Sequence, residues 1–336
     1  MPPATTIRDV AAHAAVSAAT VSRVLNGRVD VAAELRDRVL AAVADLNYRP
    51  NGAARSLRTR ATTVLGVIIS DITNPFFTSM VRGVEDAAQR AGYSVVLANT
   101  DEDLEKERRY VEVAAAEQMA GVVLSPTSSS HTSVGYLVER NIPVVTIDRR
   151  LRGTPVDSVT VNNFRAAFEA TEHLITQGCK RIGIVAGPLT TTTGSRRLAG
   201  YKAALRAAGL AEESDLVAIG DFRIDGGRAA TAELLERKID GLFVANNLMT
   251  IGALEMLGSR GLEPGRDLAV VGFDDINWGT ALRPPLTAVS QPTYEIGRQT
   301  TELLLRRIAG DDSPVQRIVL PAKLVVRESS LRRRRR

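Results

Sequence analysis

The sequence predicts a small all-α head followed by a larger α/β body, in which two lobes of parallel sheet are covered by helices on both faces. Two patterns lead to this prediction. Up to residue 47, apolar side chains recur at helical spacing, whereas from Val64 onward short β-branched runs alternate with helical stretches. The 336 residues, 44% of them apolar, are enough for the several cores that such a chain needs.

The head is expected to begin with two short helices joined by a tight turn. The first helix has an apolar face at i, i+3, i+4 and i+7, formed by Ile7, Val10, Ala11 and Ala14. Thr6, with Asp9 three residues later, can cap its start, and the turn runs through Ala15 and Val16. A third helix near residues 31–47 can close a core over the first two.

The second helix points to a function for the head. Ser17 can cap this helix, and its inner face is formed by Val21, Val24 and Leu25. Its outward side chains are small or polar: Ala18, Ala19, Ser22, Arg23 and Asn26. A helix-turn-helix presents such side chains to the major groove of DNA, although any amphipathic helical hairpin has the same pattern.

The body contains eight runs that predict strands. They are Val64–Ile69, Tyr93–Ala98, Gly121–Leu124, Val144–Ile147, Val159–Val161, Arg181–Ala186, Gly241–Ala245 and Ala269–Phe273. Ligands of open α/β sheets bind beyond the carboxyl ends of the strands, where this chain is polar. The positions there include Asp71, residues 74–77, Asn99, Asp101, Asp148, Arg149, residues 190–197, Asn246, Asn247, Asp274 and Asp275. Carboxylates and a guanidinium beside an aromatic wall suit a polyhydroxylated ring.

Charge is concentrated at the two ends of the chain. Residues 1–60 contain nine Arg against five acidic residues, and residues 332–336 are all Arg, so the overall +5 leaves residues 61–331 at −4. A basic head suits a polyanion, because phosphate contacts release counterions. The tail, Arg332 to Arg336, is interpreted as a solvated end or as a weak auxiliary DNA contact.

Several classes of protein do not fit the sequence. The single cysteine, Cys179, allows no disulfide framework, and no export signal or run of about 20 apolar residues is present, which favours a cytoplasmic, nucleoid-associated protein. Common nucleotide-binding and hydrolase motifs are absent, and His13, His131 and His173 are scattered. We therefore expect no catalytic residue, no metal and no cofactor.

Residues 48–57, YRPNGAARSL, closely resemble the hinge of the LacI/GalR family of bacterial transcription regulators. Further motifs of that family follow in order along the chain: SDITNPFF at 70–77, AGY at 91–93, RRLAGY at 196–201, VGFDD at 271–275, PLT at 285–287 and VRES at 326–329. The resemblance therefore covers nearly the whole chain.

The resemblance implies a homodimer that binds a pseudo-palindromic operator in double-stranded DNA. The matching DNA-contact positions are Thr6, Ser17, Ala18, Ala19, Thr20, Ser22, Arg23, Asn26, Tyr48, Asn51, Ala54, Arg55 and Leu57. Within this set, Ala18, Ala19 and Arg23 match the positions of sequence choice, and Arg23 should provide most of the hydrogen-bonded discrimination. Leu57 matches an apolar wedge that kinks DNA through the minor groove, with a passive linker as the alternative.

The resemblance also implies a division into domains. Residues 1–50 are expected to form the head, 51–60 a hinge helix and linker, 61–331 the effector-binding and dimerisation body, and 332–336 a tail. In the body, an N-lobe of about 61–161 plus 291–320 faces a C-lobe of about 162–290 plus 321–331. Both lobes should have the fold of periplasmic sugar-binding proteins, with a small-molecule effector between them.

The effector contacts are expected at eight positions: Phe76, Phe77, Asp148, Thr193, Arg197, Phe222, Asn246 and Asp274. Arg197, Asn246 and Asp274 match contact residues of the family, and the three phenylalanines match its stacking aromatics. Structural roles remain open, because Asp274 can cap a helix, Asn246 can turn a strand end, and Phe76 or Phe77 can belong to the core. Residues 190–193, ahead of Arg197, are all threonine, and their hydroxyls can either bind a ligand or belong to a solvated loop.

Two sites differ from the usual family pattern. Asn246-Asn247 and Asn162-Asn163 stand where members often have Asn-Asp and Asp-Asn, so we expect a less acidic cleft and an effector with fewer hydroxyls or with negative charge. The sequence as a whole predicts a repressor of genes for sugars or related carbon sources. The alternative is a solute-binding protein with the same two-lobed body, but the head, the hinge and the missing export signal argue against it.

Overall fold

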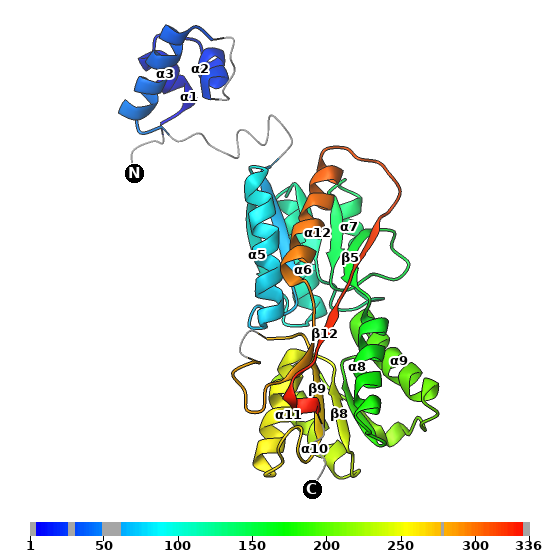
Figure 1. The fold of residues 1–336 in the computed structure, drawn as a ribbon. Coiled ribbons are helices and arrows are strands. Elements are labelled where there is room, and N and C mark those ends of the chain that lie inside the picture. The colour runs from blue at the N-terminus through cyan, green and yellow to red at the C-terminus, as the bar shows by residue number, and fades with distance from the viewer. Residues whose placement is uncertain (1–4, 26–30, 49–61, 277–278, 332–336) are drawn as a thin grey trace. The chain divides into compact units, whose positions relative to one another are not determined.

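The computed structural model describes residues 5–25, 31–48, 62–276 and 279–331, in two compact units, Met1–Thr62 and Thr63–Arg336 (Figure 1). The predicted hinge and linker, residues 51–60, lie outside the described residues, as does the basic tail. The fold class is confirmed: an α-helical head and an α/β body of two parallel-stranded lobes.

The head consists of α1 (Ile7–His13), α2 (Ala18–Leu25) and α3 (Ala33–Asp45). Thr6 and Asp9 form the expected capping box, and Ala15 takes a left-handed φ of 50° in the turn. The backbone N–H of Thr20 donates to Ser17 Oγ at 3.1 Å, which caps α2. The core contains Val10, Ala11, Ala14, Val21, Val24, Val39 and Ala42.

One expectation for the head is wrong. Ala18 does not point fully away from the core, because it is half-buried and packs against the apolar cluster of the head. The first turn of α2 follows directly on the α1–α2 turn, so its first residue still faces the neighbouring helices. Ala19 and Arg23 are exposed, as expected.

Lobe 1 is built on a fully parallel sheet in the order β11-β5-β4-β3-β1-β2. Its strands are β1 (Val64–Ile69), β2 (Ser94–Asn99), β3 (Gly121–Leu124), β4 (Val144–Ile147), β5 (Asp157–Val161) and β11 (Arg317–Leu320). The covering helices are α5 (Pro75–Arg90), α6 (Leu104–Ala116), α7 (Gly135–Val138) and α12 (Thr293–Ile308). Separate apolar clusters fill the two faces of the sheet.

Lobe 2 has a second sheet, in the order β12-β10-β9-β8-β6-β7, in which only the β10–β12 pair is antiparallel. Its strands are β6 (Ile182–Ala186), β7 (Val217–Ile219), β8 (Gly241–Val244), β9 (Ala269–Phe273), β10 (Thr287–Ser290) and β12 (Lys323–Val325). Its helices are α8 (Asn163–Thr176), α9 (Thr192–Ala207), α10 (Ile224–Leu235) and α11 (Asn247–Ser259), with 3₁₀ turns η1 (Ser214–Leu216) and η2 (Glu328–Ser330).

The chain passes between the two sheets three times. It leaves β5 for α8 at residue 162, leaves β10 for α12 at residues 291–292, and joins β11 directly to β12 through residues 321–322. Neither lobe is therefore a continuous segment of sequence. The carboxyl ends of the parallel strands from both lobes border the space between them, and residues that follow these strands line the candidate site. Figure 1 shows the two lobes of the body.

Candidate effector site

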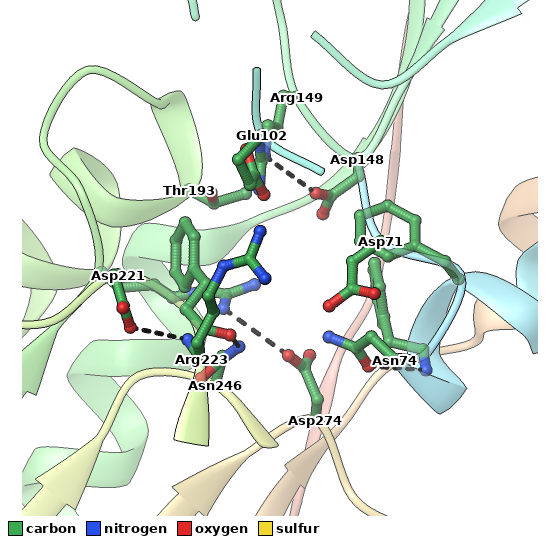
Figure 2. Close-up of a pocket in the computed structure, with 14 residues that line it drawn as sticks. Asp71, Asn74, Glu102, Asp148, Arg149, Thr193, Asp221, Arg223, Asn246 and Asp274 are labelled. Atoms are coloured by element: carbon green, nitrogen blue, oxygen red, sulfur yellow. Dashed lines mark hydrogen bonds and ion pairs between the residues drawn. The ribbon is translucent and has the colours of Figure 1, made fainter. Parts of the chain in front are cut away.

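A pocket lies between the two lobes at the ends of their strands (Figure 2). It holds about 430 Å³ of empty space, its mouth included. Lobe 1 and lobe 2 each contribute seven lining residues, which are Asp71, Asn74, Phe76, Phe77, Glu102, Asp148 and Arg149 from the first and Thr193, Arg197, Asp221, Phe222, Arg223, Asn246 and Asp274 from the second.

Arg197 reaches the pocket from the second turn of α9 and is only 3% exposed. Its Nε donates to Asn163 Oδ1 at 2.7 Å, and its Nη1 donates to the carbonyl of Ala245 at 2.6 Å. The guanidinium also lies 3.6 Å from the ring centroid of Phe273. These contacts fix the guanidinium before any ligand arrives.

Asp274 follows β9 and faces this guanidinium, with its Oδ2 at 3.8 Å from Arg197 Nη1. Gln291 Nε2 donates to its other oxygen, Oδ1. Burial raises the pKa of Asp274, while the charge of Arg197 and the hydrogen bond from Gln291 act in the opposite direction. The result is a buried carboxyl with one oxygen held by the protein and one directed toward Arg197.

A second buried guanidinium, that of Arg149, belongs to lobe 1. It forms a bidentate pair with Glu102, Nη1 to Oε2 and Nη2 to Oε1, both at 2.7 Å. Its Nε has no hydrogen-bond partner among the described residues and lies 3.4 Å from Asp148 Oδ2. Burial raises the pKa of Asp148 to about 6, with Arg149 and Arg197 opposing the rise.

Aromatic rings bound the pocket on both sides. Phe76 and Phe77 begin α5 and contact each other edge to face, with ring centroids 5.2 Å apart. Phe222 comes from lobe 2, and Gly187 provides the space for its ring, since a Cβ at residue 187 would lie 2.0 Å from Phe222 Cε1. An apolar ring face can therefore pack against phenylalanine while its edges meet the charged groups.

Three residues of the pocket have backbones in the left-handed region: Asp148 (φ 65°), Phe222 (φ 64°) and Asp274 (φ 67°). Such conformations are costly for residues with side chains and gather where a structure must aim a functional group. Asp148 and Asp274 each follow a strand directly, so the left-handed backbone conformation directs each carboxyl into the space between the lobes.

Hydrogen bonds link the two lobes around this space. Asn247 Nδ2 donates to Asn74 Oδ1 at 2.7 Å, and Arg223 Nη2 donates to the carbonyl of Asp101 at 2.8 Å. On the α9 side, the N–H of Arg150 donates to Thr192 Oγ1 at 3.1 Å, and that of Ser129 to the Thr190 carbonyl at 3.0 Å. The structure thus shows the lobes in contact across the pocket.

The eight residues expected to contact an effector all line this one pocket. Some of the alternative structural roles are also present: Asn246 Oδ1 caps α11 by accepting from Met249 N at 2.8 Å, and Phe76 and Phe77 belong to the lobe 1 core. Of the four threonines at 190–193, Thr191 caps α9 and Thr193 lines the pocket.

Three lining residues were not anticipated, namely Glu102, Asp221 and Arg223. Asp221 and Arg223 follow β7, a three-residue strand that the sequence patterns did not predict, so no strand end pointed to them. Glu102 lies three residues beyond β2, next to the predicted Asp101. Glu102 lines the pocket as the partner of buried Arg149, and the sequence does not show that these two residues are close.

The substituted asparagines that were expected to make the cleft less acidic do not all line the pocket. Asn163 and Asn247 do not line the pocket; Asn163 holds Arg197, and Asn247 bridges to Asn74. The pocket itself contains five carboxyl groups, Asp71, Glu102, Asp148, Asp221 and Asp274, against three guanidiniums. Its formal charge is negative, which does not favour an anionic ligand.

The predicted DNA-contact residues are gathered on the head where the structure describes them. Thr6, Ser17, Ala19 and Arg23 are exposed, whereas Ala18, Thr20, Ser22 and Tyr48 are half-buried. Five further positions, Asn26, Asn51, Ala54, Arg55 and Leu57, lie outside the described residues. Among the described residues no His, Cys, Asp and Glu cluster forms a metal site, and no described helix is long and apolar enough to span a membrane.

Comparisons with known proteins identify the family. Residues 6–51 match the model for bacterial regulatory proteins of the lacI family, and residues 171–330 match a periplasmic binding protein-like domain. A ribose operon repressor of Halalkalibacterium halodurans is 40% identical over 97% of both chains. The chain belongs to the lacI family.

Other members of the lacI family are similar over the same length. Catabolite control protein A of Priestia megaterium is 35% identical over 97% of this chain and 99% of its own. The lac repressor dimer bound to operator and the anti-inducer ONPF aligns with a TM-score of 0.87 at 29% identity, covering 98% of this chain and 100% of that one. The complex of the regulator CelR with cellobiose aligns at 0.74 with 35% identity over 97% and 99%.

Family membership settles the general function. This chain is a DNA-binding transcription regulator with a helix-turn-helix head and an effector-binding body. The alternative of a solute-binding protein shares only the body, and the matched head at residues 6–51 argues against it. The relatives are transcription regulators rather than enzymes.

Proposed function

We propose that this lacI-family regulator is a repressor whose operator affinity is controlled by a neutral monosaccharide of the ribose type bound between the lobes. The observation that carries the proposal is the pocket itself, in which fixed guanidiniums and carboxyls meet phenylalanine rings from both lobes. Hydroxyl pairs of a sugar match such charged groups, and its apolar face matches the rings.

The charge of the pocket favours an uncharged ligand. Five carboxyls against three guanidiniums disfavour an anionic effector, which was one of the two alternatives expected from the asparagine substitutions. The names of two relatives, both ribose operon repressors at 40% and 35% identity, agree with this choice.

In the proposed complex each contact has a role set by its geometry. The carboxylate of Asp274, beside Arg197, accepts hydrogen bonds from sugar hydroxyls. The carboxylate of Asp148, beside Arg149, accepts hydrogen bonds from other hydroxyls of the sugar. Phe222 packs on the ring from lobe 2, with Phe76 and Phe77 opposite, while Asn246 and Thr193 contribute neutral hydrogen bonds. Because these groups come from both lobes, the sugar stabilises the arrangement in which the lobes touch.

The proposed DNA complex follows the family. Two copies form a homodimer on a pseudo-palindromic operator, each placing α2 in a major groove with Ala19 and Arg23 toward the bases. Ala18 contributes less than expected because it packs on the core of the head. Leu57 remains the proposed minor-groove wedge. We infer no catalytic activity, no metal and no cofactor, and a place of action on the bacterial nucleoid in the cytoplasm.

An isosteric substitution tests the effector site. Asp274→Asn should weaken ribose binding about tenfold or more in calorimetry, because a charge-assisted hydrogen bond is lost. Affinity for an operator selected by the wild-type protein from random DNA should stay within about twofold in the absence of sugar. At a ribose concentration that saturates the wild-type protein, its operator affinity should shift at least about fivefold, and the shift for Asp274→Asn at that concentration should be smaller.

The matched control is Asp312→Asn, the same change at an exposed aspartate of lobe 1 outside the pocket. It should behave as wild type in both measurements. If the wild-type protein does not bind ribose or related monosaccharides, the proposed effector class is wrong. If Asp274→Asn binds ribose normally, the proposed role of that carboxyl is wrong.

A further inference from the structure

A second cavity lies between the lobes. Residues 148–150 and the start of α9 separate it from the effector pocket. The second cavity holds about 890 Å³ of empty space, its open mouth included. Four arginines line it: Arg150, Arg152, Arg196 and Arg317. No Asp or Glu is among its described lining residues, so its formal charge is +4. We call this cavity the arginine groove.

The four guanidiniums of the arginine groove are not neutralised by the protein. None of them forms an ion pair or a side-chain hydrogen bond with another residue in the part of the chain that the structure describes. Burial, together with the like charges of Arg317 and Arg196, lowers the pKa of Arg150. Such mutual repulsion is relieved by a bound anion.

The floor of the groove is built from three neighbouring strands. In the register of the sheet, Thr146 on β4 pairs with Ser158 on β5, and Ser158 pairs with Arg317 on β11. Register partners in a parallel sheet point to the same face, so two hydroxyls and a guanidinium form one row. Ser158 is only 2% exposed, and its Oγ has no hydrogen-bond partner among the described residues.

A buried hydroxyl without a partner is unusual and costs free energy. Ser158 is a lining residue of the groove, so a ligand oxygen that reaches its Oγ would provide the missing partner. The start of α9, a helix of 16 residues, also lines the groove, through Thr192, Ser195 and Arg196. A helix start carries a partial positive charge and attracts anions.

From these observations we propose that the arginine groove is a second ligand site, which binds a small phosphate-bearing anion through Arg150, Arg196 and Arg317 with Ser158 at its base. Guanidiniums pair with phosphate oxygens in a bidentate manner, and hydroxyls fill the remaining acceptor directions. The groove takes residues from both lobes, so the anion bridges them.

The groove and the effector pocket share two backbone segments. Arg150 lines the groove, whereas Asp148 and Arg149 line the pocket; on α9, Thr192 and Arg196 line the groove, whereas Thr193 and Arg197 line the pocket. An anion that fixes Arg150 and Arg196 therefore restrains the neighbouring pocket groups. We expect the anion to tighten sugar binding, a coupling that rests on the proposed function.

Calorimetry of the full chain with pyrophosphate, in the absence of sugar, tests the site. The double variant Arg196→Gln/Arg317→Gln should lower pyrophosphate affinity about tenfold or more, and Ser158→Ala about threefold. Both arginines are exposed, and Arg196→Gln alone provides a second test if the double variant fails to fold. The matched control is Arg109→Gln, an exposed arginine on α6 outside the groove, which should bind as wild type.

The proposal is overturned if the double variant binds pyrophosphate normally, or if Arg109→Gln weakens binding as much. Glycerol 3-phosphate and inorganic phosphate distinguish the source of the phosphate: tighter binding of the ester indicates a phosphorylated metabolite, and equal binding indicates free phosphate. Saturating pyrophosphate should raise wild-type ribose affinity at least about threefold and have no effect in the double variant. Failure of ribose to bind at all would refute the proposed effector while leaving the pyrophosphate titration interpretable.

Discussion

The effector pocket and the arginine groove are both lined with arginine. Two guanidiniums of the pocket are buried and have protein partners, whereas two of the groove are exposed and unpaired among the described residues. In the pocket, Arg149 and Arg197 are buried and already bonded, to Glu102 in one case and to Asn163 and the Ala245 carbonyl in the other. In the groove, Arg196 and Arg317 are exposed and form no ion pair with a described residue. A buried charge must be compensated by the fold itself, whereas an exposed one can remain in water until a ligand arrives.

This contrast indicates which kind of ligand each cavity suits. The buried guanidiniums of the pocket already have protein partners, so a neutral molecule can bind by offering hydroxyls to groups that are already in place. The groove keeps an uncompensated positive charge, so an anion gains most there. Three predictions test this contrast, in decreasing order of effect.

The largest effect is expected from breaking the compensation of Arg149. Glu102→Gln removes the carboxylate partner of a buried guanidinium and should lower the free energy of unfolding by about 3 kcal/mol. The value is at the low end for such losses, because Asp148 lies 3.4 Å from Arg149 Nε. Arg196→Gln in the groove should change it by less than about 0.5 kcal/mol. Urea unfolding followed by far-UV circular dichroism measures both; similar losses would remove the contrast.

A smaller effect is expected from the pH dependence of stability. The folded pKa of Asp148 is about 6, above its ordinary value of 3.8, so the native state binds this proton more tightly than the unfolded state does. Stability contributed by the protonated form is therefore lost as pH rises from about 4 to about 6, by about 2–3 kcal/mol. Asp148→Asn should remove that part of the slope, and Arg196→Gln should retain it. An unchanged slope in Asp148→Asn would show that burial does not raise this pKa.

The smallest effect concerns the contact between the lobes. Asn247→Ala removes the 2.7 Å hydrogen bond to Asn74 beside the pocket. It should weaken ribose binding about fivefold, equivalent to about 1 kcal/mol, by favouring separation of the lobes. Pyrophosphate binding should weaken less than ribose binding, because the groove has its own link between the lobes, from Arg150 N to Thr192 Oγ1. Equal weakening of both ligands would mean that the two cavities do not respond separately.

The sequence predicted most of the sheet and much of the pocket, for physical reasons that differ from place to place. Strands such as Val64–Ile69 and Gly121–Leu124 are buried on both faces, so continuous apolar runs mark them clearly. The missed strands β7, β11 and β12 are short, and their side chains are partly exposed, so their composition does not separate them from loops. Strand β10 is buried, but its sequence TAVS contains only one large apolar residue, so no continuous apolar run marks it.

The limits at the site have a similar origin. Asp148 and Asp274 could be located because each directly follows a recognisable strand. The pair of Glu102 with Arg149 joins residues 47 positions apart, and the bridge from Asn247 to Asn74 spans 173 positions. No periodicity encodes such contacts. The arginine groove was missed for the same reason, since its four arginines come from three separate segments.

The three passages of the chain between the lobes have a consequence for synthesis on the ribosome. The head is complete once residue 48 has emerged, but lobe 1 must wait for α12 and β11, near the other end of the chain. Until then, one edge of β5 has unpaired backbone groups, and the apolar surface that Leu303 and Leu304 later cover remains exposed to water. A nascent chain therefore carries a complete DNA-binding head and an incompletely folded body. Its exposed apolar surface is a target for chaperones until α12 and β11 have been synthesised.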